Sequence, residues 1–504
     1  MRYFNSAREY HEKTKYTFEK VKSVYREYAS AEQPPTFKDY PEKSVFALPR
    51  QYSKTTLRFS QAVKNHKEFS MFHHPKDDPL DLNILSHLLY LTNGVTLTRE
   101  YPAGKISLRS SPSASRLYPI EVYVYARRIQ GLEAGLYYFH PIHHQLVQLS
   151  REDLWSRIEE SLFNLNFIKN APAMLLLTSV FPRSVVKFGE RSYRYCLMEA
   201  GYVGENLAVA ASGLDLGLNL IGDFADDDLN ALLQIDGSEE AVVMAAPIGK
   251  KAGAVQREAY MFGMIPEDED QIGNRFDSLI TGIHRNSSHF LPTNHLSKVS
   301  VELPFNEKPR IIKPSGSLIK LPSPVSNMED SVHAVIERRR SSYQFSRLPI
   351  TREELSTLLY HLNSVPLLYD YPAYFVYVVV NQVENLENGV YLYHPEHHAL
   401  ELLKAGTYRG DTSYMTLAQD AVFNCSVAFF FSADFEDINI FSNRGYRYAH
   451  FNIGMLSENL YLTATALELG VRGIGNYFDD SINQFFNVRI PHENILGGVI
   501  AGRS

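Results

Sequence analysis

The chain repeats much of itself after about 250 residues. Residues 135–149 (GLYYFHPIHHQLVQL) return as residues 389–403 (GVYLYHPEHHALELL), an offset of 254 (389 − 135). Residues 191–195 (RSYRY) return as residues 444–448 (RGYRY), an offset of 253 (444 − 191). Solenoid repeats recur every ~20–50 residues, so a period this long indicates the duplication of a whole domain. Two similar domains on one chain are able to pack like the halves of a C2 dimer, with pseudo-twofold sites between them.

The composition is that of a globular protein with more than one domain. A chain of 504 residues is too long for a single hydrophobic core and fits two or three domains. Its 50 basic residues are outnumbered by 57 acidic ones, a balance that argues against a nucleic-acid partner. No apolar run approaches the ~20 residues of a membrane span, and Cys196 and Cys425 are too few for a disulfide framework or a zinc site. We therefore expect a cytoplasmic protein with no metal and no membrane partner.

The two copies and the segments around them predict four regions. Residues 1–55 are expected to form a helical N-terminal extension and linker, and residues 56–265 the first domain. Residues 266–325 are polar and broken by Pro and Gly, which is typical of a connecting arm. Residues 326–504 are expected to form the second domain.

Both copies show the same order of expected elements. In the first copy these are helix 84–92, strand 120–128, a strand at the end of 167–180, helix 191–214 and strand 241–249. In the second they are helix 351–361, strands 374–380 and 426–433, helix 446–469 and strand 496–501. This mixture predicts an α+β fold in which helices pack on a mainly antiparallel sheet. The long helix of each copy is expected at the interface of an intramolecular pseudo-dimer.

An arginine-rich segment in the second copy is a candidate anion-binding site. Residues 338–345 read RRRSSYQF and follow an expected short helix. Guanidinium groups present paired donors to anionic oxygens, so this segment is suited to clamp a phosphate. The alternative is a solvated basic helix end, where the helix dipole favours positive charge.

Two further segments bring the backbone close to a potential ligand. Residues 112–119 (PSASRLYP) enter a strand, and their small side chains let main-chain groups approach a bound molecule. The alternative is an ordinary Ser/Pro loop. Residues 220–224 (LIGDF) and 473–477 (GIGNY) follow the long helices, and glycine there allows a backbone N–H to face a bound ring. The alternative is a helix C-cap followed by a strand.

Taken in order, these motifs resemble the FMN-dependent nitroreductase superfamily. The subgroup that the chain resembles is the SagB-type dehydrogenases, which oxidise azolines to azoles in ribosomal peptide maturation. Members normally form a homodimer with two FMN sites at its interface, so the resemblance implies a fused pseudo-dimer here. It implies one composite FMN site, with a clamp, a glycine turn and a late basic residue from one repeat and a Pro-Ser loop from the other.

Carried onto this chain, the resemblance implies fourteen cofactor-binding positions. The second repeat supplies Arg339, Arg340, Ser341, Tyr343, Gln419, Gly473, Ile474, Gly475, Asn476 and Arg503, and the first supplies Pro112, Ser113, Ala114 and Ser115. Arg503 would meet the phosphate, and the backbone of the turn 473–476 would face the N5 edge of the flavin.

The opposite composite site looks broken. Where the second repeat has its arginine clamp, the first has His66-Lys67-Glu68, and a glutamate near a phosphate is repulsive. Where the first repeat has the Pro-Ser loop, the second has residues 365–370 (VPLLYD), whose bulky side chains would fill a flavin slot. We therefore expect one FMN per chain.

The resulting hypothesis is a flavin-dependent oxidoreductase that transfers hydride at FMN N5, with NAD(P)H as a transient electron donor and a small molecule or a peptide as substrate. Lys187 is the candidate base, and the alternative for it is an exposed surface lysine. Phe188 stands where related azoline dehydrogenases have Tyr, so we expect inefficient azoline oxidation. The alternatives are a flavin-binding or sequestering protein with little turnover, and a peptide-azoline dehydrogenase. Further dimerisation of the fused chain stays open.

Overall fold

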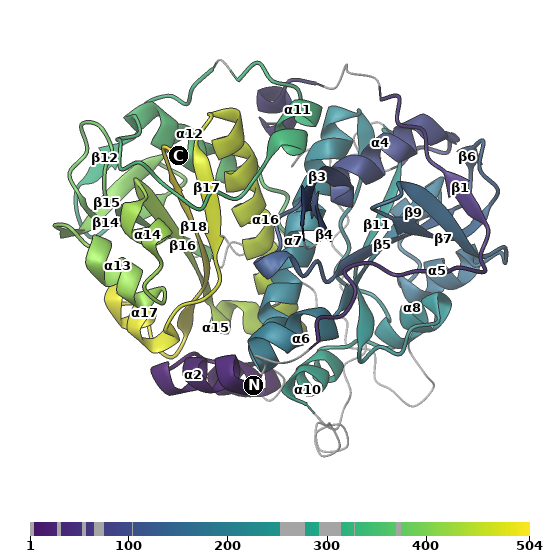
Figure 1. Cartoon of the computed structure of the whole chain (residues 1–504), viewed down its shortest axis with the longest axis horizontal. Coiled ribbons are helices and arrows are strands. Elements are labelled where there is room, and N and C mark those ends of the chain that lie inside the picture. The colour runs from purple at the N-terminus through teal and green to yellow at the C-terminus, as the bar shows by residue number, and fades with distance from the viewer. Residues whose placement is uncertain are drawn as a thin grey trace.

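The structure, a computed structural model, has two lobes side by side, each built on one antiparallel sheet (Figure 1). It describes residues 5–27, 32–52, 57–64, 75–102, 104–252, 278–291, 314–326, 328–368 and 374–504. The first lobe comes from the first copy of the repeat and the second lobe from the second copy. Among the described residues, no helix is long and apolar enough to cross a membrane.

The two large sheets have the same number of strands and the same order. The first runs β1 (Val45–Ala47), β8 (Gln145–Ser150), β7 (Gly135–His140), β5 (Ile120–Ala126), β9 (Ala173–Val180), β11 (Glu240–Lys250) and β10 (Leu216–Leu218). The second runs β12 (Leu318–Lys320), β15 (Ala399–Ala405), β14 (Gly389–His394), β13 (Tyr374–Val380), β16 (Val427–Asp434), β18 (Glu493–Gly502) and β17 (Gly470–Ile474). Every pair of neighbours in them is antiparallel, which confirms the predicted fold class.

Helices cover the sheets and fill the space between them. Those of the first lobe and its N-terminal segment are α1 (Asn5–Lys13), α2 (Phe18–Glu27), α4 (Leu82–Asn93), α5 (Trp155–Ser161), α6 (Pro182–Phe188), α7 (Ser192–Gly213) and α8 (Asp226–Leu233). Those that follow are α10 (Leu279–Asn286), α11 (Val332–Arg338), α12 (Arg352–Leu362), α13 (Arg409–Met415), α14 (Asp420–Asn424), α15 (Phe435–Ile438), α16 (Arg444–Ala466) and α17 (Asp479–Phe486).

The long helices α7 and α16 form the centre of the interface, as the pseudo-dimer predicts (Figure 1). Both are buried along almost their whole length. They cross at Gly201 and Gly454, where a Cβ on either residue would lie 2.1 Å from a carbonyl oxygen of the other helix. Only glycine fits so close an approach. One continuous apolar core contains side chains of both helices and of both sheets.

The segments before each lobe are also equivalent. Strand β1 lies within the expected N-terminal extension and β12 within the expected arm, and each adds an edge strand to its sheet. Just after them, the backbone N–H of Leu48 donates to His144, and that of Leu321 donates to His398. The offset at these residues is 273 (321 − 48), so the duplication extends into both segments.

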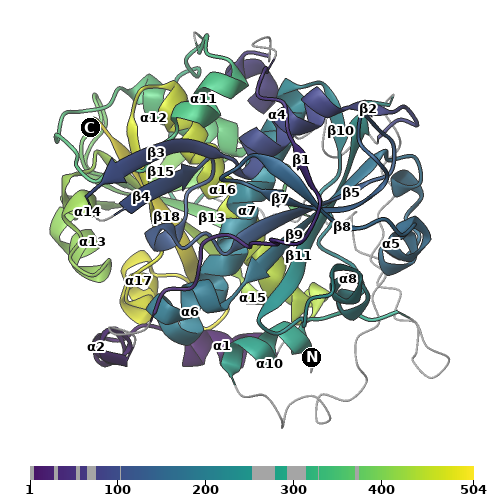
Figure 2. The ribbon, with the colours of Figure 1, turned by 45° about the vertical axis from the view of Figure 1, so that its right-hand side comes forward.

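A small hairpin distinguishes the two copies. Strands β3 (Val95–Tyr101) and β4 (Gly104–Arg109) form a separate two-stranded sheet, and β2 (Leu80–Asp81) with β6 (Ile129–Gln130) form another. The hairpin lies where the first copy is longer, because the offset falls from 270 (360 − 90) to 253 (372 − 119) across it. Figure 2 shows it reaching toward the second lobe. It ends directly before the loop 112–115.

Candidate functional site

A cleft of about 170 Å³ lies between the lobes. It brings together ten of the expected cofactor residues: Pro112, Ser113, Ala114, Ser115, Ser341, Tyr343, Gln419, Gly473, Gly475 and Asn476. The other residues that line it are Phe188, Tyr195, Met198, Glu199, Tyr202, Tyr461 and Arg472. Both lobes therefore contribute residues to one cavity.

The loop from the first lobe is held in a specific shape. The backbone N–H of Ala114 donates to Glu199 at 2.7 Å, and that of Tyr118 donates to the Ser113 hydroxyl at 2.8 Å. Ser115 and Arg116 both have positive φ, 54° and 62°, a conformation that glycine adopts most easily. The loop thus keeps a strained backbone without glycine, and hydrogen bonds within it and to Glu199 on α7 hold it.

The second lobe supplies a glycine turn backed by tyrosines. The backbone N–H of Gly473 donates to the Tyr461 hydroxyl at 2.6 Å, and that hydroxyl lies 3.1 Å from the Ser341 hydroxyl. The Tyr195 hydroxyl, from the first lobe, donates to Asn476 at 2.8 Å. A Cβ on Gly475 would lie 2.7 Å from the Tyr195 ring. Glycine at this position therefore lets the turn pack closely against the Tyr195 ring.

Arg339 is buried beside the cleft and does not line it. Its Nε donates to the carbonyl of Ser110 at 2.7 Å and its Nη2 to that of Arg109 at 3.3 Å. Its Nε also lies 3.8 Å from a carboxylate oxygen of Glu458. Its Nη1 is buried and has no hydrogen-bond partner among the residues that the structure describes. Arg339 therefore fastens the end of the hairpin to the second lobe and keeps one donor unused.

Four other expected site residues also lie outside the lining. Arg340 donates to Thr96 on the hairpin, at 3.2 Å to its hydroxyl. Nη2 of Arg503 donates to both carboxylate oxygens of Glu354, at 2.8 and 2.9 Å. Ile474 is buried in the apolar core of the second lobe. Lys187 is exposed near the end of α6.

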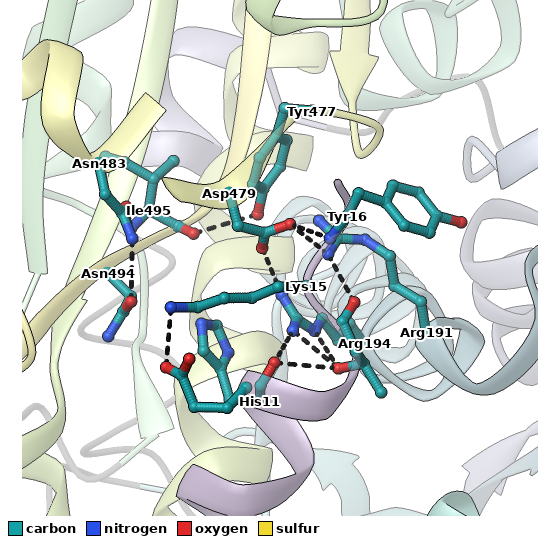
Figure 3. Close-up of polar contacts among 12 residues, drawn as sticks. His11, Lys15, Tyr16, Arg191, Arg194, Tyr477, Asp479, Asn483, Asn494 and Ile495 are labelled. Atoms are coloured by element: carbon teal, nitrogen blue, oxygen red, sulfur yellow. Dashed lines mark hydrogen bonds and ion pairs between the residues drawn. The ribbon is translucent and has the colours of Figure 1, made fainter. Parts of the chain in front are cut away.

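Next to the glycine turn, two arginines of the first lobe form ion pairs with an aspartate of the second (Figure 3). Arg191 and Arg194 contact Asp479 at 2.7 and 2.9 Å, and all three side chains are buried. The backbone N–H of Tyr16 also donates to Asp479, at 2.7 Å. Arg191 reaches the cleft through its Nε, which donates to the Tyr195 hydroxyl at 3.0 Å. The N-terminal segment and the cleft wall therefore share one polar network.

Two ionisable groups in the cleft were not predicted from the sequence. Burial raises the pKa of Glu199 to about 8, although its contacts with Ser113, Ala114 and Arg109 oppose the shift. Arg472 stacks on the Tyr343 ring at 4.6 Å. Glu199 follows the repeated RSYRY motif on the same helix, and Arg472 precedes the glycine turn, so proximity to those motifs was the available signal.

The equivalent position in the other half is filled. Asn452 takes the place of Glu199 (452 − 199 = 253) and accepts from the backbone N–H of Leu368 at 2.8 Å. The Leu368 side chain lies against Gly222, since a Cβ there would come within 3.1 Å of it. Gly222 is the counterpart of Gly475 (475 − 222 = 253). His66, Lys67 and Glu68 lie outside the described residues, as do positions 369 and 370.

A solved structure matches this two-lobed chain along almost its whole length, and two curated relatives each match 34% of it. A crystal structure from Anabaena variabilis, described as a nitroreductase, covers 99% of this chain and 99% of its own, with a TM-score of 0.78 and 26% identity. MJ1384 of Methanocaldococcus jannaschii, named as a nitroreductase, is 32% identical over 173 residues, which are 34% of this chain and 82% of the relative. The trifolitoxin-processing protein TfxB of Rhizobium leguminosarum bv. trifolii is 27% identical over 178 residues, 34% of this chain and 48% of TfxB. The nitroreductase family model matches residues 76–250 and 336–503, one stretch in each lobe. The chain therefore belongs to the nitroreductase family, in a tandem form.

Proposed function

We propose that the chain is a flavin-dependent oxidoreductase that transfers hydride at N5 of one FMN held between its lobes. The observation that carries this proposal is the cleft, whose walls come from both copies of the repeat. The loop 112–115 forms one wall, and Ser341 and the turn 473–476 form the other. This is the composite arrangement that the family resemblance implies.

The residues around the cleft fit a flat ring with a phosphate tail. Gly475 lines the cleft and, without a side chain, packs against the Tyr195 ring. Tyr202 and Tyr461 lie edge to face, with their ring centroids 6.5 Å apart, and give the cleft an aromatic side. Arg472 lines the cleft, and Arg339 lies beside it with a buried donor that lacks a partner among the described residues. Buried donors without partners are uncommon, so an anionic group suits this place.

Different residues would bind the FMN and shield its reacting atoms from water. Bound FMN would supply hydride transfer, which is the chemistry of the cofactor itself. Ser341 and Arg472 would hold the phosphate, because a hydroxyl and a guanidinium both donate to anionic oxygens. The backbone of the turn 473–476 would face the ring. Phe188 and the loop 112–115 would keep water from the reacting atoms.

The second candidate function is dehydrogenation of a modified peptide. TfxB, which is named for trifolitoxin processing, supports a peptide substrate. Phe188 argues against azoline oxidation, because it lines the cleft and offers no phenol for proton transfer. Reduction of a small molecule with electrons from NAD(P)H is therefore the reaction that we favour.

The test is the flavin content of the purified full-length chain and its reduction by NADPH. We expect about one FMN per chain after reconstitution, with rapid bleaching of the flavin absorbance by NADPH or NADH. A ratio near two would contradict the single composite site. Tight flavin binding without reduction by either nucleotide would favour a sequestering protein, and no flavin binding would overturn the proposal.

A further inference from the structure

A buried carboxyl group in the cleft has a neutral counterpart in the other lobe. Glu199 and Asn452 occupy equivalent positions on α7 and α16. Each accepts a backbone N–H of the loop that faces it, from Ala114 at 2.7 Å and from Leu368 at 2.8 Å. Asn452 also donates to the Leu368 carbonyl at 3.3 Å. An amide is therefore sufficient to hold such a loop.

The carboxyl group is found only on the side with the cleft. Glu199 is 3% exposed and lines the cleft, whereas Leu368 fills the space near Asn452. Burying a carboxyl group is costlier than burying an amide that makes the same hydrogen bond, because its charged form loses hydration. Since loop binding does not require the carboxyl group, its acid–base chemistry is the property that distinguishes Glu199 from its counterpart.

We infer that Glu199 is the proton donor and acceptor of this cleft. The inference rests on the proposed function. When a substrate gives up two hydrogens, one leaves as a hydride with the electron pair, and the other leaves as a proton that the Glu199 carboxylate accepts. In the reverse direction, the acceptor takes a hydride and the O–H bond of protonated Glu199 breaks to supply the proton. Glu199 then returns to its starting state by exchange with water.

The surroundings of Glu199 suit this role at neutral pH. Burial raises its pKa to about 8, so the protonated form predominates at pH 7 and the carboxylate stays accessible. The groups that face it are the Ser113 hydroxyl, the Ala114 N–H, the Arg109 guanidinium and, more weakly, Tyr118, Cys196 and Tyr202. Of these only Arg109 carries a charge at neutral pH, and it is fixed by its contacts with the backbone.

The test compares Glu199→Gln with the wild-type chain, both reconstituted with FMN. Glutamine keeps the acceptor for Ala114 but removes the acid, as asparagine does in the other lobe. We expect unchanged FMN affinity within about twofold, and reoxidation by p-benzoquinone slowed about 100-fold at pH 6. In the wild type this rate should fall as the pH rises through about 8, because the donor loses its proton. The variant should show no such fall.

A second measurement does not depend on turnover. The midpoint potential of the bound flavin should change its pH slope near pH 8 in the wild type, and this break should vanish in Glu199→Gln. Glu199→Asp keeps a carboxyl group and should keep the break. If Glu199→Gln binds FMN and retains both the rate profile and the break, the role of Glu199 is wrong while the proposed function stands. If the wild type binds no FMN, both fall.

Discussion

The ion cluster at Asp479 offers the sharpest test of how the lobes and the cleft depend on each other. Asp479→Asn keeps the shape of the side chain but removes its charge and one of its accepting oxygens. Arg191 and Arg194 would then be buried without a carboxylate, since both contact Asp479 at under 3 Å. Removing one partner of a buried charge cluster typically costs about 3–5 kcal/mol, because the remaining charges stay desolvated. We expect a loss of this size in the free energy of unfolding at pH 7.

The other lobe contains a matched control. Asp226 accepts from Arg444 and Arg447, both at 2.6 Å, and from the backbone N–H of His289 at 2.9 Å. This arrangement repeats that of Asp479, with the segment that includes α10 in place of the segment that includes α1. Asp226→Asn should therefore lower the stability by a similar amount. Among the described residues, the hydrogen bonds of this cluster do not reach the cleft as the one between Arg191 and Tyr195 does.

The shifted pKa values of Asp479 and Asp226 determine how the stability that each contributes depends on pH. Burial alone would raise the pKa of each aspartate, but the paired arginines lower it below the ordinary value. A carboxyl group with a lowered folded-state pKa contributes stability above its unfolded pKa of about 3.9. This contribution is lost as the pH falls through the folded-state pKa. The difference between wild type and either variant should thus be complete at pH 7 and shrink only in strong acid.

Two readouts separate the structural and functional consequences. Urea denaturation should show similar shifts for Asp479→Asn and Asp226→Asn. Fluorescence titration with FMN should show at least about tenfold weaker binding for Asp479→Asn alone, since a loss of about 1.4 kcal/mol at the cleft corresponds to that factor. If both variants bind FMN like the wild type, the cluster does not position the cleft. If Asp226→Asn weakens FMN binding as much, the coupling does not follow the local contacts described above.

Four further substitutions, one of them a control, test the geometry. Gly475→Ala should weaken FMN binding about tenfold or more, because its methyl group would collide with the Tyr195 ring and displace the cleft wall, whereas Gly222→Ala should leave the affinity unchanged; fluorescence titration of both decides this. Gly454→Ala should destabilise the fold by about 1–3 kcal/mol and so lower the thermal midpoint, since its methyl group would lie 2.1 Å from the Met198 carbonyl oxygen. An unchanged midpoint would contradict the tight crossing of the helices. Phe188→Tyr should increase any oxidation of a thiazoline peptide, and no increase would show that the missing phenol is not limiting.

Much of the fold was predictable because duplication supplied each element twice. The strand predicted over 374–380 matches β13, and the helix predicted over 191–214 differs from α7 by one residue at each end. Strands β1 and β12 were missed because each has only three residues within a segment rich in Pro. The hairpin of β3 and β4 was missed because it is largely exposed and lacks an apolar run.

The cleft was predictable as a set of segments, but less so residue by residue. The loop 112–115 and the turn 473–476 were predicted because their small residues and glycines are a pattern that the sequence itself shows. The positions of Arg339 and Arg503 were not, because their partners are distant in the chain. Arg503 pairs with Glu354, a residue 149 positions away, and Arg339 holds the backbone near Ser110. No local pattern indicates whether an arginine meets a ligand or a carboxylate of its own chain.

The comparison of the two lobes separates what the fold requires from what the cleft requires. The clusters around Asp479 and Asp226 have kept the same contacts on both sides, and so has the crossing of the two central helices at glycine. These features join the lobes, so both copies retain them. By contrast, the two lobes differ at Glu199 and its counterpart Asn452. Leu368 fills the space beside Asn452, whereas the equivalent space beside Glu199 and the loop 112–115 is the cleft. Fusion of the two copies allows this asymmetry, because every substitution in a homodimer appears at both sites. In the fused chain, one site is able to fill with packed side chains while the other retains its carboxyl group and its cavity.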